Sequence, residues 1–384
     1  MGCVFCSVVI FENRAVGGVA ADLDRPAAPE LDRVVTSESS FTLPSRSTGL
    51  LENLGHPAGF DFLIQPSFSY VEGKTGRFLL ENSYLGMGWK IDDSISSYFR
   101  LGGRDLMGQP KIFWLSTEVS ESQAEWNLVE GYLQWSNSLW GRIRVGLIPV
   151  PFGLQGGENE IYLYTPLSLF WRQPKVSRRD LGLNYHIDFD GFFSDWTVHH
   201  GEGGADVDNE AWFTARWGYG DRQWARMGFS ASVGRLGSSY LQTEPQTFSH
   251  SVESGQVRMG QAFLFLRGLI FDTSHTIRAE WYQGEFRQAE QIIPFRSGYV
   301  DLEVGIARNS SVVARYDYLD PESLTNSVSR QEASFGLQIK NKNRTFLFSI
   351  VGTKKLESSD RPSVHQLSLY WRMTPAATEG LSPL

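Results

Sequence analysis

Apolar and polar side chains alternate residue by residue along most of this chain from about residue 60 onward. In the segment 140–148, Ile143 and Val145 alternate with Arg142 and Arg144. A period of two places these side chains on opposite faces of the backbone and predicts a β-strand with one apolar and one charged face. Such segments are close to the roughly 9–11 residues that a tilted strand needs to cross a bilayer. We expect about sixteen strands, at 60–70, 77–91, 95–106, 125–136, 140–148, 177–187, 192–200, 210–219, 223–234, 256–267, 275–285, 297–307, 311–318, 331–340, 343–351 and 364–373.

The connections between these segments alternate in length. Short connections made of tight-turn residues lie at 92–93, 137–138, 188–191, 220–221, 272–274, 309–310 and 341–342. Longer connections lie at 107–124, 149–176, 235–255, 286–296, 319–330 and 352–363, with 71–76 and 201–209 intermediate. Barrels of the bacterial outer membrane have this asymmetry, with short turns on the periplasmic side and longer loops outside. An even number of strands would place both ends of the barrel in the periplasm.

The alternation predicts a fold class as well as single strands. Apolar rows such as Val300, Leu302 and Val304 would face lipid, while the opposite rows would face water. In lipid every backbone polar group must be paired within the protein, and a sheet achieves this only when it closes into a barrel. The mean hydropathy is -0.25 and no run of about 20 apolar residues occurs, so no membrane-spanning helix is expected. We therefore predict an all-β protein, a transmembrane antiparallel β-barrel of about 16 strands. Aromatic residues that would form girdles at the two membrane surfaces are Trp89, Trp135, Trp140, Trp217, Tyr219, Trp224 and Trp371.

Composition limits the remaining options. The net charge of -8 argues against nucleic acid as a partner. The two cysteines are Cys3 and Cys6, so the barrel itself has neither a disulfide nor a thiolate metal site. Adjacent His199 and His200 lie near several carboxylates, but without the spacing of a metal site, so we expect a solvated loop there. We predict no cofactor, no metal and no catalytic residues.

The chain divides into four expected parts. Residues 1–21 contain a short interrupted apolar run and a small-residue stretch that resembles a cleavage site, which fits either a weak or mis-started signal peptide or no signal at all. Residues 22–57 have no periodicity and are expected to be an extended or disordered periplasmic segment. The barrel would span 58–373, with a tail at 374–384. The last strand, 364–373, resembles the closing strand that barrel-assembly machinery reads.

The chain resembles the family of phosphate-selective porins O and P. The residues that carry this resemblance are 142–154 (RIRVGLIPVPFGL) and 178–183 (RRDLGL), with further similarity at 85–89, 98–101 and 129–134. The resemblance covers roughly residues 58–373. It implies a 16-stranded barrel, usually a homotrimer, in the outer membrane of a Gram-negative bacterium. It also implies a loop that folds into the pore, and basic side chains that guide anions to the constriction.

The resemblance assigns roles to particular positions. The constriction loop, 149–176, would begin at Pro149, Pro151, Phe152 and Gly153, because proline fixes φ and removes a backbone donor, so the strand cannot continue. Arginines on the predicted lumen faces would line the pore and guide anions: Arg100, Arg142, Arg144, Arg178, Arg216, Arg226, Arg278 and Arg315.

The same lumen faces carry acidic residues, which departs from an anion-selective pattern. They are Glu81, Glu130, Asp180, Glu280, Asp301, Glu303, Asp317 and Glu332. These mixed rows fit two interpretations: ion-paired ladders that stiffen the wall, or a true anion guide. We therefore expect a passive porin for small hydrophilic solutes or ions, including anions such as phosphate. Three alternatives remain: a plugged structural or adhesive barrel, an outer-membrane enzyme, and a soluble β protein.

Overall fold

The computed structural model describes the chain from residue 56 to residue 373, with gaps. The described ranges are 56–71, 77–80, 83–103, 126–157, 167–172, 177–201, 210–221, 224–236, 255–270, 273–288, 291–320, 329–340, 346–356 and 364–373. They all belong to one compact unit, Gly49–Leu384. The expected leader, the expected extended segment up to residue 55 and the tail at 374–384 lie outside these ranges, as do Glu81 and the carboxylates near His200.

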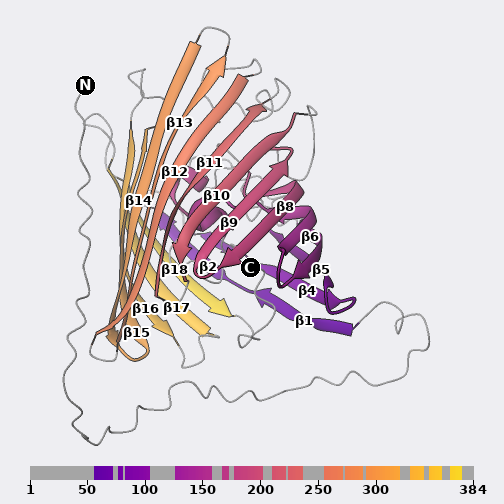
Figure 1. The fold of residues 1–384 in the computed structure, drawn as a ribbon. Coiled ribbons are helices and arrows are strands. Elements are labelled where there is room, and N and C mark those ends of the chain that lie inside the picture. The colour runs from indigo at the N-terminus through magenta and orange to yellow at the C-terminus, as the bar shows by residue number, and fades with distance from the viewer. Residues whose placement is uncertain are drawn as a thin grey trace, which may run out of the picture. The chain divides into compact units, whose positions relative to one another are not determined.

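Antiparallel strands make up nearly all of the described chain (Figure 1). Two short helices, α1 (Gly153–Gly157) and α2 (Leu169–Arg172), interrupt them. The strands are β1 (His56–Leu63), β2 (Pro66–Val71), β3 (Arg77–Leu80), β4 (Tyr84–Lys90), β5 (Ile95–Gly103), β6 (Trp126–Asn137), β7 (Gly141–Pro149), β8 (Arg179–Phe189), β9 (Phe192–His199), β10 (Trp212–Gly220), β11 (Ala225–Leu236), β12 (Gly255–Ile270), β13 (Thr273–Gln288), β14 (Gln291–Ala307), β15 (Ser310–Asp320), β16 (Arg330–Lys340), β17 (Phe346–Leu356) and β18 (Val364–Met373).

The eighteen labelled strands form a ring of sixteen. β1 pairs with β4 and β2 pairs with β3 in nearly the same register, so β1–β2 and β3–β4 are the two arms of one interrupted hairpin. β2 also pairs with β18, from Gln366 opposite Val71 to Tyr370 opposite Ser67, and a bridge between Ile64 and Met373 extends this contact. Each following strand pairs with the next, so the last strand closes on the first. This confirms the predicted barrel and its strand number.

The two faces of the wall match the predicted alternation. On β14, Val300 and Leu302 are 45% and 37% exposed, whereas Asp301 and Glu303 between them are 4% and 8% exposed. Leu133 on β6 and Phe335 on β16 are also exposed, at 56% and 66%. Apolar side chains therefore point outward, where a bilayer would cover them, and charged side chains point into the ring. Among the described residues no helix is long and apolar enough to cross a membrane.

Tight turns connect the strands at one end of the ring. Phe189 pairs with Phe192, and the two residues between them, Asp190 and Gly191, have φ values of 48° and 79°. Positive φ at both central positions is the geometry of the type I′ hairpin, which Asp-Gly favours. Asp92 closes another turn by accepting hydrogen bonds from the amides of Ser94 and Ile95. Both turns lie at connections that the sequence predicted to be short.

One predicted connection is wrong. Residues 286–296 were expected to form a long loop, but β13 extends to Gln288 and β14 starts at Gln291, opposite it. Pro294 has no backbone donor, yet it lies within β14 opposite Glu285. The flanking Ile293 and Phe295 are 5% and 0% exposed, so burial of these two side chains inside the ring stabilises the extended hairpin. As a result β12, β13 and β14 rise beyond their neighbours (Figure 1).

The outward position of Leu302 predicts the effect of a charge there. Leu302→Arg on β14 is expected to destabilise the folded barrel in lipid by about 2–4 kcal/mol, because an arginine near the bilayer midplane loses hydration. The matched control is Ile292→Arg at the extended end of the same face, which should cost about 0–1 kcal/mol. Urea unfolding in lipid vesicles measures both values. Equal costs at the two positions would contradict the assignment of this face to lipid.

Candidate functional site

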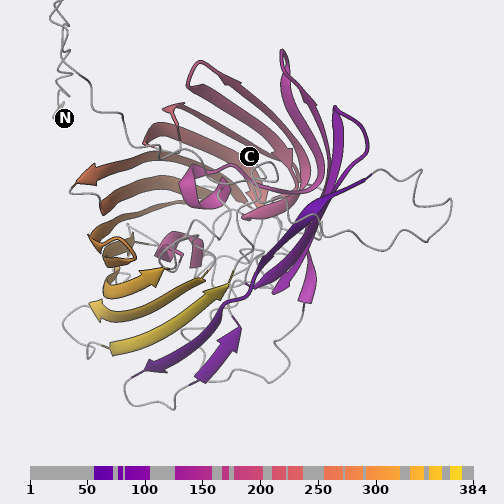
Figure 2. The ribbon, with the colours of Figure 1, turned by 90° about the horizontal axis from the view of Figure 1, so that it is seen from below.

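The segment that follows β7 turns into the ring. β7 ends at Pro149, and the amide of the next residue, Val150, donates to the carbonyl of Arg178 over 2.8 Å. Val150 and Phe152 are both 0% exposed, and α1 begins at Gly153. Figure 2 looks along the ring and shows the two magenta helices inside it. The predicted infolded loop and its start at Pro149, Pro151, Phe152 and Gly153 thus agree with the fold, although 158–166 and 173–176 lie outside the described residues.

Glycine is required at position 153. Its φ of +73° is unfavourable for other residues, and a Cβ atom there would lie 2.1 Å from Oε1 of Glu280. The amide of Gly153 donates to Oγ of Ser230 over 3.0 Å, and its carbonyl accepts from Nη1 of Arg216 over 2.9 Å. Gly153 therefore lets the loop backbone approach the wall closely enough to bond with β10, β11 and β13.

The carboxylate of Glu280 is the main polar anchor of the loop. It accepts hydrogen bonds from the amides of Leu154 and Gln155. The same group accepts from the hydroxyl of Tyr299 over 2.6 Å and from Nε2 of Gln261 over 2.8 Å. Glu280 is 3% exposed, so its carboxylate has lost most of its hydrating water. These four donors replace the hydrogen bonds that the water would have made. A wall residue that the sequence placed among the lumen charges therefore serves to hold the loop.

An aromatic cluster holds the second part of the loop. Phe170 of α2 stacks on Tyr282 of β13 with ring centroids 4.0 Å apart and planes 9° apart. Trp171 donates from Nε1 to the hydroxyl of Tyr282 over 3.1 Å, and Phe152 packs against all three rings. The amide of Leu169 donates to Asp317 of β15. Since these rings are at most 1% exposed, the described part of the loop is bound to the β10–β15 side of the ring.

Several of the predicted lumen arginines, Arg100, Arg216 and Arg315 among them, pair with carboxylates. Arg100 donates to Glu130 over 2.7 Å and to Asp61 over 3.3 Å. Arg216 donates to Asp195 over 2.7 Å. Arg315 bonds to Asp317 over 2.6 Å, and Asp317 also holds the loop through Leu169. The pairs Arg100–Glu130 and Arg216–Asp195 join neighbouring strands, whereas Arg315 and Asp317 lie on the same strand. The two cross-strand pairs match the ion-paired interpretation.

The other five arginines have different surroundings. Arg144 is 2% exposed, donates to the side-chain amide of Gln134 over 2.8 Å and lies 5.0 Å from the ring centroid of Tyr132. No carboxylate pairs with Arg144 within the described ranges. Arg178 donates to the carbonyl of Gln155 in α1, and Arg226 lies 3.6 Å above the ring of Phe193. Arg142 is half-buried, and Arg278 is 4% exposed opposite Asp301.

Sequence reasoning missed several residues of this site. Arg179 was not among the predicted lumen arginines, but it is 2% exposed and donates to Glu130 over 2.8 Å. It does not follow the alternation of β8, because β8 begins only at this residue. Asp61 accepts from Tyr84, Tyr98 and Arg100. An acidic residue inside the otherwise apolar 60–64 segment was the available signal for Asp61. Asp195 alternates with Trp196 on the way to Thr197, so the period of two was the available signal for its inward position.

The expected solvated loop at His199 is wrong. His199 is 1% exposed and its Nδ1 lies 2.7 Å from Oδ2 of Asp180, while its Nε2 lies 2.9 Å from the hydroxyl of Thr214. Thr214 in turn bonds with Ser232, so a polar chain crosses four neighbouring strands. The long polar side chains of β8 and β9 point inward here, which buries the imidazole. Within the described ranges no group of three or more His, Cys, Asp and Glu residues could hold a metal ion.

Known structures share this fold at low sequence identity. A loop L8 deletion mutant of OmpT, an outer membrane protein of Vibrio cholerae, is 12% identical with a TM-score of 0.59, and the match covers 84% of this chain and 99% of that one. The outer membrane channel DcaP of Acinetobacter baumannii is 10% identical with a TM-score of 0.54 over 82% and 96% of the two chains. An anion-selective porin from Comamonas acidovorans is 12% identical with a TM-score of 0.51 over 82% and 98%. No protein-family model and no curated protein matches the sequence.

These similarities confirm the barrel fold, and the matched proteins agree with the outer-membrane location expected from the sequence. At such identities they do not extend to a choice of solute. The family named by the sequence resemblance is supported only at the coarser level of a porin-type barrel.

The contacts of Glu280 predict how the loop responds to a neutral side chain. Glu280→Gln should weaken the bonds to the Leu154 and Gln155 amides by about 1.5–3 kcal/mol, since bonds to charged groups contribute that much. Hydrogen exchange at these two amides, measured in detergent, should then accelerate roughly 10–100-fold.

The matched control is Glu303→Gln on β14. Glu303 accepts from Lys340 and Ser311 in the wall, so exchange at residues 153–157 should keep its wild-type rate. An unchanged exchange rate in Glu280→Gln would show that the loop does not depend on this carboxylate.

Proposed function

We propose that this protein is a passive diffusion channel in the outer membrane of a Gram-negative bacterium. The observation that carries the proposal is the segment after β7, which enters the ring and is bonded to the opposite wall through Glu280 and Tyr282. A segment fixed inside a lumen narrows the route through it, and the size and charge of the remaining route determine which solutes pass. The proposed substrates are small hydrophilic solutes and ions. The channel needs no chemical step.

Charge in the lumen supports a modest preference for anions, including phosphate. Arg100, Arg216 and Arg315 are paired with carboxylates, which largely cancels their field. Arg144 keeps its charge beside a neutral amide and an aromatic ring, so it is the residue that we expect to attract anions most. Arg142, two residues before it, would add to this field. The Comamonas protein of similar fold is described as anion-selective, which is consistent with this proposal.

A homotrimer is the proposed assembly. The OmpT of Vibrio cholerae has been solved in a trimer form, and its fold is similar at 11% identity and a TM-score of 0.56. The outward apolar rows could contact lipid or another subunit. Export by a signal peptide in residues 1–21 and insertion by barrel-assembly machinery through β18 complete the proposal.

A plugged barrel is the second candidate, and one observation favours it. Inward polar residues on β16, β17 and β18 are buried although α1 and α2 bind elsewhere: Gln338, Ser349 and Ser368 are 0%, 1% and 3% exposed. A lumen that is filled along this wall would give a structural or adhesive barrel without transport. Conductance distinguishes the two functions directly.

Single-channel recording in a planar bilayer tests the channel. The full chain should give discrete conductance steps, and a salt gradient should give a reversal potential of the sign for anion preference. Arg144→Gln should reduce that potential, because it removes a lumen charge that no carboxylate balances.

The control is Arg235→Gln, an equal change of charge on the outer face of β11, which should leave the potential unchanged. Steps with cation preference would overturn the anion proposal and keep the channel. Folded protein without steps would identify the plugged barrel.

The aromatic cluster predicts a second electrical effect. Phe170→Ala removes a buried ring, and such changes cost about 3–5 kcal/mol, so the loop should detach from β13 and open-channel noise should rise. The control is Phe335→Ala, whose ring is 66% exposed on the outer face and should not affect the current. A quiet current of wild-type size in Phe170→Ala would show that these helices do not form the constriction.

A further inference from the structure

The ring of His186 lies on the lumen side of β8. Leu183 and Phe189 on the same strand are 46% and 75% exposed on the outer face, so the alternation places His186 inward. Its side chain is 13% exposed, whereas that of His199 is fully buried. His186 is therefore a titratable group inside the ring that water can reach.

A carboxylate fixes one nitrogen of this imidazole. Nδ1 lies 2.9 Å from Oδ1 of Asp195, which is directly opposite His186 on β9. Because a carboxylate only accepts hydrogen bonds, the neutral ring carries its proton on Nδ1 and donates it to Asp195. Nε2 then has no proton, and no described side chain bonds to it. Nε2 is therefore the atom that gains a proton when the medium is acidified.

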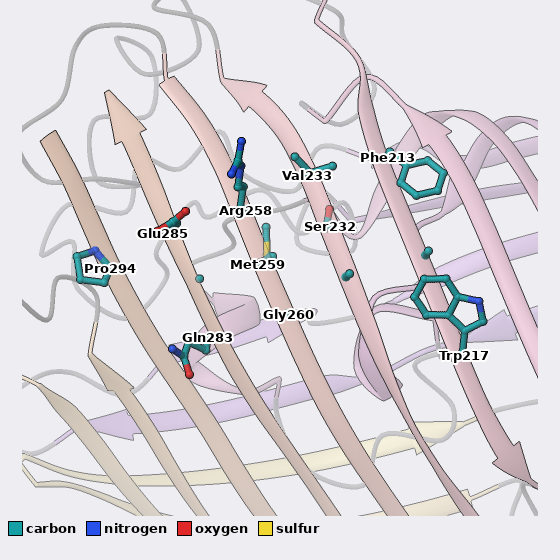
Figure 3. A pocket seen from close by; sticks show the side chains of 13 residues that line it. Phe213, Trp217, Ser232, Val233, Arg258, Met259, Gly260, Gln283, Glu285 and Pro294 are labelled. Carbon is teal, nitrogen blue, oxygen red and sulfur yellow. The ribbon is translucent and has the colours of Figure 1, made fainter. Parts of the chain in front are cut away.

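Asp195 already balances another cation. Arg216 donates to Oδ2 of Asp195 from Nε over 2.9 Å and from Nη2 over 2.7 Å. Trp217, the next residue on β10, lines a groove on the outer face of the wall (Figure 3), so Arg216 points into the ring of strands. Nη1 of Arg216 donates to the carbonyl of Gly153 over 2.9 Å. These bonds hold Arg216 beside Asp195 whether or not the imidazole is charged.

The surroundings of His186 are therefore positive before the ring itself is charged. Five charged groups lie near it: Arg142 opposite it on β7, Arg144 next on the lumen face of that strand, Asp195 on β9, Arg216 on β10 and the exposed Asp188 on its own strand. Three of these charges are positive and two are negative. A proton on Nε2 would raise the local net charge from one positive charge to two.

We propose that His186 is a selectivity-determining residue of the channel, and that its protonation strengthens the preference for anions in acid. The proposal rests on the proposed channel function. An ion that passes β8 meets one more lumen cation when the ring is charged, and this charge attracts anions and repels cations. Histidine ordinarily changes its charge between roughly pH 5 and 8, where carboxylates and guanidinium groups ordinarily keep theirs.

Reversal potentials of the full chain in a planar bilayer test the proposal, at about pH 7.5 and about pH 5. On acidification the anion-to-cation permeability ratio of the wild type should rise about twofold, the effect of a unit charge roughly 8 Å from an ion in water. His186→Gln keeps a donor for Asp195 but takes up no proton, so its ratio should not change. The matched control is His275→Gln on the outer face of β13, where His275 bonds to Thr273; it should respond like the wild type.

Two further measurements separate charge from a structural effect. His186→Lys carries a permanent charge, so its anion preference at about pH 7.5 should already reach the wild-type value at about pH 5. In roughly 1 M salt the Debye length falls to about 3 Å, so the acid-pH difference between the wild type and His186→Gln should largely disappear. A difference that persists in high salt would show a change of pore structure and would overturn the proposal.

The remaining outcomes distinguish this proposal from the channel itself. An equal response to pH in His186→Gln and the wild type would assign the titration to other groups, and His186 would not determine selectivity. Conductance steps whose selectivity is the same at both pH values would also overturn the role of His186, but would leave the channel standing. Folded protein without steps at either pH would overturn the channel proposal, and this one with it.

Discussion

The structure depends on one constraint: every backbone amide and carbonyl in a lipid-facing wall needs a partner within the protein. A sheet meets it by joining its last strand to its first, here through β18 and β2. Closure fixes which side of each strand is outside, because successive side chains alternate across the pleat. The exposed Val300 and Leu302 and the buried Asp301 and Glu303 on one strand follow directly from that geometry. Even the interruption between β1 and β2 is tolerated, since Ile64 continues the pairing across it.

This constraint explains why the wall was predictable from the sequence. A strand that is apolar on one side and polar on the other has an alternating sequence, and this pattern can be recognised without any distant contact. Each of the sixteen expected segments therefore corresponds to a strand. Local reasoning failed where another requirement acted. Pro294 indicates a break by its own chemistry, but Ile293 and Phe295 beside it are buried inside the ring and extend the hairpin. Arg179 follows no alternation because the strand starts at that residue.

The candidate site was predictable in kind and not in detail. Two prolines and a glycine mark the point where the chain leaves β7, and the positive φ of Gly153 explains why glycine is there. The destination of the loop depends on Glu280, 126 residues further along the chain, and on the stacking of Phe170 and Tyr282. Contacts between residues so distant require the register of the five intervening strands, β8 to β12. A single sequence carries no local record of that register, so Glu280 looked like one more lumen charge.

The same distinction changes how the lumen charges are understood. A row of arginines seen in the sequence suggests an anion ladder, but pairing with acidic residues on neighbouring strands converts Arg100 and Arg216 into cross-links of the wall. In such a pair each charge compensates for the hydration that the other has lost on burial, and the two opposite charges together produce little net electrostatic field. In the proposed channel, selectivity would then depend on the few cations whose partners are neutral, of which Arg144 is the clearest in the described chain. An acidic protein can therefore still prefer anions, because total charge and the charge that a passing ion meets are set by different residues.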